Sequence, residues 1–305
     1  MTANTTLRRY LYLIRFTQKP FRYPSIEDII VGLPEKIVGK RTIERDFATI
    51  RNEYGISIKH EPYKKGYYLD IPLDEDIRDF ENFVELLERQ ERMDFLNKTI
   101  TNVHEAGQYL QLEQHSKFVG TNNLPILWEA LRSQRAVSFE YMPYKENPIA
   151  EQRNIEPGLI FEYRNRWYLD GWDLERKGVR TFGLDRITAL VLTDKTVNKK
   201  HLDNLKNIRQ HVIGVTSPAD ATAEKVVLRF INKEAHYLKS LPLHPSQKII
   251  NETTTHTDFE LTVILNHELM REVLAFGELV EVLEPQKLRE EIAERVVKLG
   301  KKYLQ

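Results

Sequence analysis

The sequence of 305 residues contains no cysteine. This absence excludes a disulfide framework, a thiolate metal site and a cysteine nucleophile, and it fits a protein of the reducing cytoplasm. No run of about 18 apolar residues occurs, so we expect no membrane span. Leu7–Phe16 is apolar, but arginines interrupt it and no small-residue cleavage site follows, so it is interpreted as a helix and not as a signal peptide.

The motifs of the common enzyme classes are also missing. None of G-x-x-x-x-G-K-S/T, G-x-G-x-x-G and G-x-S-x-G occurs. His267-Glu268 begins like the zinc motif H-E-x-x-H, but the fifth position is Arg271, so the ligand spacing fails. We therefore expect a protein that is not an enzyme, with no catalytic residues, no metal and no cofactor. A site assembled in space from distant residues stays open.

Length and charge indicate several domains with different partners. A chain of 305 residues exceeds one ordinary core, and 41% hydrophobic with 30% charged residues is typical of a folded protein. The net charge of zero hides an asymmetry, because residues 1–70 carry +5 and residues 71–120 carry −6. A basic head (residues 1–70) beside an acidic connector (residues 71–120) suggests that only the head binds polyanions.

Residues 1–71 have the pattern of three helices and a β-hairpin, which predicts a winged helix-turn-helix. Ser25, followed three residues later by Asp28, predicts the capping box that begins the second helix. Gly55 is predicted to end the third helix. The other expected segments are helices over Leu7–Phe16 and about Lys40–Tyr54, and strands over Ile56–His60 and Tyr67–Leu69.

The third expected helix has one apolar and one polar face. Ile43, Phe47 and Ile50 fall on one buried seam with Tyr54. The opposite face is small, cationic or amide-bearing, as a helix in the DNA major groove requires, and two lysines lie in the turn of the hairpin. The alternative is a three-helix packing unit with an ordinary solvated face. The residues predicted to bind DNA are Lys40, Arg41, Thr42, Arg45, Thr49, Asn52, Lys64 and Lys65.

Residues 72–120 are predicted to be a helical connector. Apolar residues between Ile77 and Leu96 have no obvious partner within a single helix pair, which implies packing on another domain or subunit. We therefore expect a homodimer and, with it, a pseudo-palindromic DNA site. The alternative, a solvated linker helix, leaves this apolar surface unexplained.

Residues 121–200 predict a helix over Leu124–Arg135 followed by five short strands, an arrangement typical of a small β-barrel. Alternation places Trp167 and Leu169 on the face opposite Tyr168, and we expect both, with Phe139, in the core. The expected strands lie near Val137–Met142, Arg153–Tyr163, Arg166–Trp172, Val179–Leu184 and Ala189–Thr193.

Three segments of this region closely resemble the WYL-domain family. They are Trp167-Tyr168-Leu169, the upstream run Arg153–Leu159 and the downstream run Arg180–Ile187. The resemblance implies a small SH3/Sm-like barrel behind a winged helix-turn-helix, where it senses a ligand that is often nucleic acid or nucleotide-like. The run Arg41–Phe47 is likewise similar to the recognition helix of the DeoR-type winged helices that accompany WYL domains.

The resemblance also implies a ligand-binding face formed by Tyr168, Arg180 and Arg186, with Arg153. Guanidinium groups bind phosphate bidentately and aromatic rings stack on bases, so these residue types suit an anionic, nucleotide-like or single-stranded nucleic-acid effector. The alternative is that Asp185 or Glu156 pairs with the arginines as structural bridges. For Arg186 both interpretations stay open.

Residues 201–222 are predicted to be a linker and residues 223–305 a β-α-β-β-α-β module of the ferredoxin-like kind. This module is similar to the C-terminal extension behind many WYL domains, and alone it suggests packing or dimerisation. Altogether the sequence predicts an α+β multidomain protein: a cytoplasmic, homodimeric, sequence-specific regulator that binds double-stranded DNA and an anionic effector. The alternative is a nucleic-acid-processing enzyme or accessory protein that uses the barrel for substrate.

Overall fold

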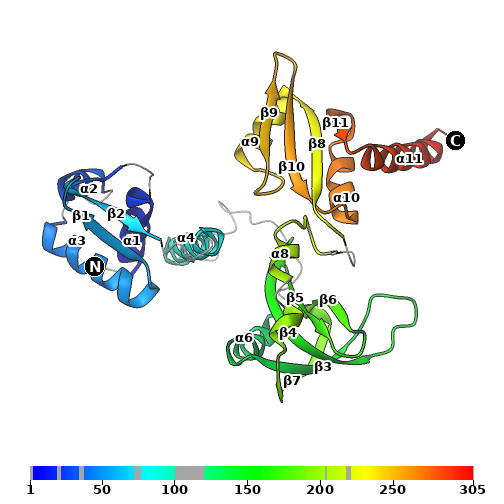
Figure 1. Ribbon diagram of the computed structural model, residues 1–305, viewed down its shortest axis with the longest axis horizontal. Helices are drawn as coiled ribbons and strands as arrows, with labels where there is room; N and C mark the ends of the chain where they lie inside the picture. The colour runs from blue at the N-terminus through cyan, green and yellow to red at the C-terminus, as the bar shows by residue number, and fades with distance from the viewer. Residues whose placement is uncertain are drawn as a thin grey trace. The chain divides into compact units, whose positions relative to one another are not determined.

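The computed structural model describes residues 3–18, 22–33, 38–71, 77–99, 120–202, 205–217 and 221–304. The chain is a mixed α/β protein that divides into two compact units, Met1–Glu113 and Gln114–Gln305. Figure 1 shows a helical first unit with one hairpin and a second unit that contains two larger sheets. Within the described ranges, no helix is long and apolar enough to cross a membrane.

The described part of the first unit follows the order of elements predicted from the sequence. The predicted capping box is present: Ser25 Oγ accepts from Asp28 N at 3.1 Å, and Ser25 N donates to Asp28 Oδ2 at 2.9 Å. Gly55 ends α3 with φ +71°. The elements are α1 (Ala3–Thr17), α2 (Ile26–Gly32), α3 (Lys40–Tyr54), β1 (Ser57–Glu61), β2 (Gly66–Asp70) and α4 (Ile77–Thr99).

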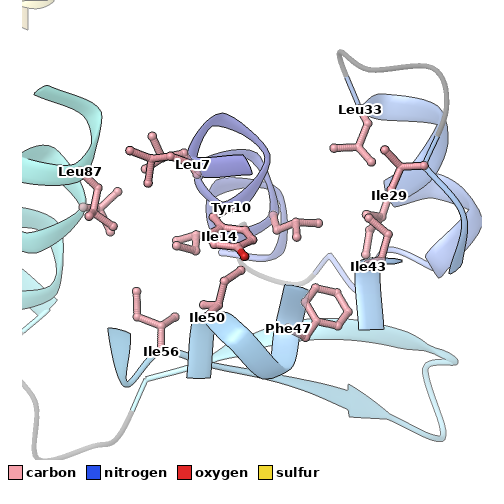
Figure 2. Close-up of a cluster of buried hydrophobic side chains, with 14 of the residues drawn as sticks. Leu7, Tyr10, Ile14, Ile29, Leu33, Ile43, Phe47, Ile50, Ile56 and Leu87 are labelled. Atoms are coloured by element: carbon pink, nitrogen blue, oxygen red, sulfur yellow. The ribbon is translucent and has the colours of Figure 1, made fainter. Parts of the chain in front are cut away.

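The core of this unit lies between α1, α3 and α4. Ile43 and Ile50 of α3 are fully buried there, and Figure 2 shows them with the side chains of the neighbouring elements. Three apolar residues of α4 belong to the same core: Phe80, Val84 and Leu87. These three therefore pack on residues of the segment 1–71, which agrees with the prediction that the connector's apolar groups pack on another domain or subunit. Among the described residues of α4, Leu86 and Met93 remain largely exposed.

The central sheet of the second unit is antiparallel and has the strand order β6-β5-β4-β3-β7. Its strands are close to the five expected ones. Phe139 and Leu169 are fully buried and Trp167 packs against them, which confirms the predicted core. The elements are η1 (Thr121–Asn123), α6 (Leu124–Ser133), β3 (Arg135–Tyr141), β4 (Glu151–Tyr163), β5 (Arg166–Asp173), β6 (Gly178–Gly183), η2 (Leu184–Arg186) and β7 (Ile187–Thr196).

The segment predicted as a linker contains two short helices, α7 (Lys199–Leu202) and α8 (Leu205–Arg209), and Leu205, Val212 and Ile213 are buried. Beyond it the order β-α-β-β-α-β is observed as predicted, followed by a further helix, and the sheet order is β11-β8-β10-β9. These elements are β8 (Glu224–Ile231), α9 (Asn232–Ser240), β9 (Lys248–Glu252), β10 (His256–Val263), α10 (His267–Ala275), η3 (Gly277–Leu279), β11 (Val280–Glu284) and α11 (Gln286–Tyr303).

Candidate nucleic-acid and ligand interfaces

The residues predicted to bind DNA lie on α3 and in the turn between β1 and β2. Thr42 and Thr49 are half-buried, and the Thr49 hydroxyl donates to the carbonyl of Arg45 at 3.1 Å, so it already has an acceptor within the helix. The other six side chains are exposed. They are Lys40, Arg41, Arg45, Asn52, Lys64 and Lys65.

A buried ion pair fixes the position of α3 in the first unit. The guanidinium of Arg9, on α1, binds both carboxylate oxygens of Asp46, on α3, and each side chain is about 2–3% exposed. Asp46 lies on the inner side of α3, next to the apolar seam, whereas Arg41 and Arg45 face solvent. The pair therefore sets the orientation of the exposed basic face. Sequence reasoning missed it, because both residues looked like ordinary surface charges.

The hairpin is anchored to the segment that precedes α2. Tyr67 N donates to Pro24 O at 2.9 Å. A Cβ atom at Gly66 would lie 2.0 Å from the carbonyl oxygen of Tyr23, so only glycine permits this approach. The ring of Tyr67 also contacts that of Phe47 on α3, with 5.0 Å between centroids. The turn with the two lysines is thus held on the same core as α3.

Aromatic and cationic side chains gather on the outer face of strands β4 and β5. The rings of Phe161 and Tyr168 face each other across the two strands and stack with centroids 5.4 Å apart. One step along the same face, Tyr163 lies opposite Arg166. Leu169 points into the core from the other face, as the predicted alternation requires. A stacked aromatic pair beside a guanidinium is a surface suited to a base and its phosphate.

Asp185 organises the cations next to this face. Its Oδ2 accepts from Tyr144 Oη at 3.0 Å and lies 3.5 Å from Arg166 Nη1. Its Oδ1 lies 3.7 Å from Arg186 Nε. The Arg186 guanidinium stacks over the rings of Tyr144, at 4.7 Å, and Tyr141, at 5.1 Å. Asp185 therefore pairs with Arg186, as the alternative of structural bridges predicts. The same carboxylate, however, faces the guanidinium groups of both Arg166 and Arg186.

The side chain of Arg186 is partly exposed and incompletely hydrogen-bonded. Its side chain is 22% exposed, and its buried Nε has no hydrogen-bond partner in the described part of the chain. Space for its guanidinium comes from Gly183, which lies opposite Tyr168 in the sheet. A Cβ at Gly183 would lie 2.6 Å from Arg186 Nη2 and 2.6 Å from Asp185 Oδ1. The glycine of the downstream motif thus admits the cation to the face that carries Tyr168.

The phenol of Tyr168 responds to all of these charges. Burial raises its pKa, the guanidinium groups of Arg166 and Arg186 oppose that shift, and the carboxylates of Asp185 and Glu268 reinforce it. Glu268 belongs to α10, so a residue of the C-terminal sheet domain also lies near this face. Gly183 lies opposite Tyr168 and directly beside the Arg186 guanidinium, which places Tyr168 and Arg186 in one cluster.

The other two predicted ligand residues lie elsewhere. Arg153 is buried on the core side of β4, where it pairs with Glu151 and lies 3.8 Å from Asp173. Arg180 lies opposite Gly171, on the face of β6 that alternates away from Tyr168, and its Nη1 donates to Val179 O at 2.8 Å. Arg180 is exposed, whereas Arg153 is not. The four predicted residues therefore do not converge on one point.

Sequence reasoning missed Arg166, Phe161 and Tyr163. The signal for Arg166 was present, because residues i and i+2 of a strand share a face and Arg166 stands two before Tyr168. Phe161 and Tyr163 pair with Tyr168 and Arg166 in a register that is continuous from the two-residue turn between β4 and β5. The expected strands Arg153–Tyr163 and Arg166–Trp172 leave that same turn, so its spacing was the signal for these two residues. Among the described residues, no cluster of three His, Asp or Glu side chains could hold a metal ion.

Comparison with known proteins assigns the two sheet domains. Residues 122–192 match the WYL domain, and residues 222–300 match the WCX domain. The chain carries a WYL domain followed by a WCX domain. The aromatic and cationic face and the Asp185 cluster belong to the WYL domain, and α10 belongs to the WCX domain.

The chain is similar in sequence to mycobacterial PafB proteins. It is 41% identical to Protein PafB of Mycobacterium leprae over 68 residues, which are 22% of this chain and 20% of that protein. It is 26% identical to Protein PafB of Mycobacterium bovis over 177 residues, 57% of this chain and 51% of that protein. The matched region thus spans between a fifth and about half of the length of these relatives.

Two solved structures are similar at low identity. Proteasome accessory factor B/C (PafBC) of Arthrobacter aurescens is 17% identical with a TM-score of 0.33, over 95% of this chain and 46% of that chain. A CRISPR Cas-related protein is 13% identical with a TM-score of 0.41, over 98% of this chain and 85% of that chain.

Proposed function

We propose that this protein is a sequence-specific, DNA-binding transcriptional regulator whose WYL domain binds an anionic nucleotide or single-stranded nucleic-acid effector. The observation that carries the proposal is the face of the WYL domain on which the Phe161–Tyr168 stack lies beside Arg166 and Arg186. Aromatic rings stack on any base, and guanidinium groups bind phosphate, so this face suits a nucleic-acid ligand. The WYL and WCX domains and the similarity to PafB proteins support a WYL-domain regulator.

The first unit is proposed to be a winged helix-turn-helix that binds double-stranded DNA. Three features support this assignment: the order of three helices and a hairpin, the exposed basic face of α3, and the two exposed lysines of the hairpin turn. In such a domain α3 enters the major groove and the turn contacts the phosphate backbone. Arg41 and Arg45 are the side chains we assign to the groove, and Lys64 and Lys65 those we assign to phosphates.

The ligand site proposed here differs in part from the one the sequence suggests. Tyr168 and Arg186 stay in it, and Arg166 joins them because it shares their face. Arg180 is retained as a peripheral cation, since it is exposed but lies on the other face of β6. Arg153 leaves the site, because its buried guanidinium is paired with Glu151. The removal of one partner from a buried pair would destabilise the fold and reveal little about ligand binding.

The finer fold assignments and the oligomeric state are part of the same proposal. When the strands of each sheet are numbered from its first strand, β3 or β8, the central sheet has the order 5-1-2-3-4 and the last sheet the order 4-1-3-2. The first order supports an SH3/Sm-like barrel, and the second supports a ferredoxin-like module.

We propose a homodimer on a pseudo-palindromic operator in the cytoplasm, supported by the exposed Leu86 and Met93 of α4. Light scattering that shows a monomer at micromolar concentration, with and without operator DNA, would overturn the dimer.

The proposed function is tested by selection of bound sequences from a random duplex pool, followed by titration of the selected DNA with and without a short single-stranded oligonucleotide. We expect one enriched, pseudo-palindromic sequence, and we expect the oligonucleotide to change the affinity for it. By thermodynamic reciprocity, the duplex must change the affinity for the oligonucleotide by the same factor. An unenriched pool, or duplex binding that the oligonucleotide and nucleotides leave unchanged, would contradict the proposal.

A further inference from the structure

A carboxylate of the WCX domain is bound by the ligand face of the WYL domain. Tyr163 Oη donates to Glu272 Oε1 at 3.0 Å, and Arg164 Nη2 donates to the same oxygen. Tyr163 lies directly beside Phe161 and opposite Arg166 on the outer face of β4 and β5. Arg164 begins the two-residue turn that joins these strands, and its guanidinium also lies over the Tyr163 ring, at 5.6 Å. An anionic side chain thus occupies one end of the proposed ligand face.

A second carboxylate of the same helix belongs to Glu268. Glu268 stands one helical turn before Glu272, so both carboxylates lie on the same side of α10. Glu268 is among the charged neighbours of Tyr168 and is only 7% exposed. Its Oε1 accepts from Thr216 Oγ1 at 2.9 Å, whereas its buried Oε2 has no partner within the described ranges.

The segment between the two domains holds α10 in this position. Arg209 binds Asp170 of β5 through Nε, and its Nη1 and Nη2 donate to the carbonyl oxygens of Gly214 and Val215. Asn266, the N-cap of α10, donates to the carbonyls of Ile213 and Thr216. Residues 209–216 are therefore bonded to the WYL domain on one side and to the start of α10 on the other.

The contact with Glu272 has the strength of a partly exposed ion pair. The side chain of Arg164 is 54% exposed and that of Glu272 is 19% exposed. Such pairs contribute little net free energy, because water and salt screen them. A nucleic-acid ligand presents several phosphates, each of which binds guanidinium through charge-assisted hydrogen bonds, and its bases add stacking on the aromatic pair. An anionic ligand on this face can therefore replace Glu272 at Tyr163 and Arg164.

We propose that α10 of the WCX domain is an intramolecular competitor of the effector: Glu272 occupies Tyr163 and Arg164 until an anionic ligand displaces it. This inference rests on the proposed function, because it needs an anionic ligand on the same face. Release of Glu272 frees one end of α10 from the WYL domain and couples ligand binding to the arrangement of the two domains. That change in arrangement is how occupancy of the face is transmitted beyond the WYL domain.

The competition is measured with a fluorescently labelled oligothymidylate and the full chain. Glu272→Gln keeps the size of the side chain and removes its charge, so we expect affinity to increase about two- to fivefold. Glu278→Gln is the matched control, since it removes the same charge from an exposed residue three positions beyond α10. Its affinity should equal that of the wild type. Equal affinity of the Glu272→Gln and Glu278→Gln proteins would overturn the inference.

A crosslink provides a second measurement, because the wild-type chain has no cysteine. In the double variant Arg164→Cys with Glu272→Cys, a short bis-maleimide joins α10 to the turn of the WYL domain. We expect the crosslinked protein to lose oligothymidylate binding relative to the same variant before crosslinking. We also expect the oligothymidylate to slow the crosslinking reaction. Unchanged binding after crosslinking would contradict the inference.

The outcomes separate this inference from the proposed function. If the wild type binds oligothymidylate and neither Glu272→Gln nor the crosslink changes binding, the ligand site stands and the competition is excluded. If only Glu272→Gln binds, both hold, and the wild-type face is occupied by its own helix. If the wild type and Glu272→Gln both fail to bind oligothymidylate and also nucleoside triphosphates, the anionic ligand site and the competition are both excluded.

Discussion

Arg9 of α1 and Asp46 of α3 form a buried, bidentate ion pair beneath the exposed basic face of α3. The removal of one partner from such a pair leaves an uncompensated buried charge and costs about 3–5 kcal/mol. We therefore expect Arg9→Met to lower the free energy of opening of α3 by about that amount. Hydrogen exchange of peptides from α3 measures it.

The control for this measurement is Glu85→Gln, which breaks the exposed Glu85–Arg89 pair of α4. Exposed i,i+4 pairs contribute about 0.3–0.5 kcal/mol, so exchange in α3 should hardly change. Equal exchange of α3 in the two variants would show that the buried pair does not hold this helix.

The exposed cations of the first unit should fall into two classes. Arg45→Ala should weaken binding of the selected operator by about 1–3 kcal/mol if its guanidinium contacts a base. Lys64→Ala and Lys65→Ala should weaken binding of all sequences alike, and each should reduce the slope of log affinity against log salt by about 1. Fluorescence anisotropy over a range of salt concentrations separates the two effects.

Lys233→Ala is the control for these cations, since Lys233 is an exposed lysine of the second unit. A folded variant that lacks Arg41, Arg45, Lys64 and Lys65 together and still binds DNA like the wild type would exclude α3 and the turn as the DNA interface.

Substitutions in the WYL domain should rank by their distance from the stacked aromatic pair. Tyr168→Ala should weaken oligonucleotide binding by about 1–3 kcal/mol, because one base loses its stacking partner. Arg186→Ala should cost about 1.5–3 kcal/mol through a lost charge-assisted contact. Arg180→Ala should cost less, since Arg180 lies on the other face of β6. Calorimetric titration gives the three affinities.

Arg176→Ala serves as the control for that ranking. Arg176 is exposed and pairs with Glu151, which also binds the buried Arg153. Its loss should leave oligonucleotide affinity unchanged. Equal losses for Arg176→Ala and Arg186→Ala would mean that only net charge matters, and would return Arg186 to the role of a structural ion pair.

Gly183 is expected to be essential for the ligand face although it contacts no ligand. The added methyl group of Gly183→Ala would lie 2.6 Å from both Arg186 Nη2 and Asp185 Oδ1, so the guanidinium must move. Oligonucleotide affinity should fall while DNA binding by the first unit persists. Gly178→Ala is the matched control on the same strand, because the nearest atom to its methyl group is the flexible end of Arg180, at 3.2 Å, and the nearest backbone atom is 3.9 Å away.

The stability of the WCX domain should fall in acid through Asp258. A hydrogen bond from Arg229 lowers the pKa of this carboxyl, against the opposing effect of burial. A carboxyl whose folded pKa is lowered stabilises the fold above its ordinary pKa of about 4, and the contribution is lost as the pH falls through the lowered value. Hydrogen exchange of β10, corrected for its intrinsic pH dependence, should show this loss in the wild type. Asp258→Asn should show less of it.

Short-range patterns of residues account for the local structure of this protein. Periodicity placed α3 at Lys40–Tyr54, and the Ser25–Asp28 capping box and the Gly55 stop were both confirmed. The alternation of Trp167, Tyr168 and Leu169 gave the correct faces of β5. These features depend on residues a few positions apart, whose spacing fixes the face of a helix or strand on which each lies.

Which charged side chains pair with one another depends on the packing of the whole chain. Arg153 pairs with Glu151 on the core side of its sheet, whereas Arg186 lies beside Asp185 and is partly exposed. Glu272 reaches the ligand face from a helix more than 100 residues away in the sequence. Such contacts join segments that no short-range pattern relates. They arise because buried charges and apolar faces must find partners when the whole chain packs.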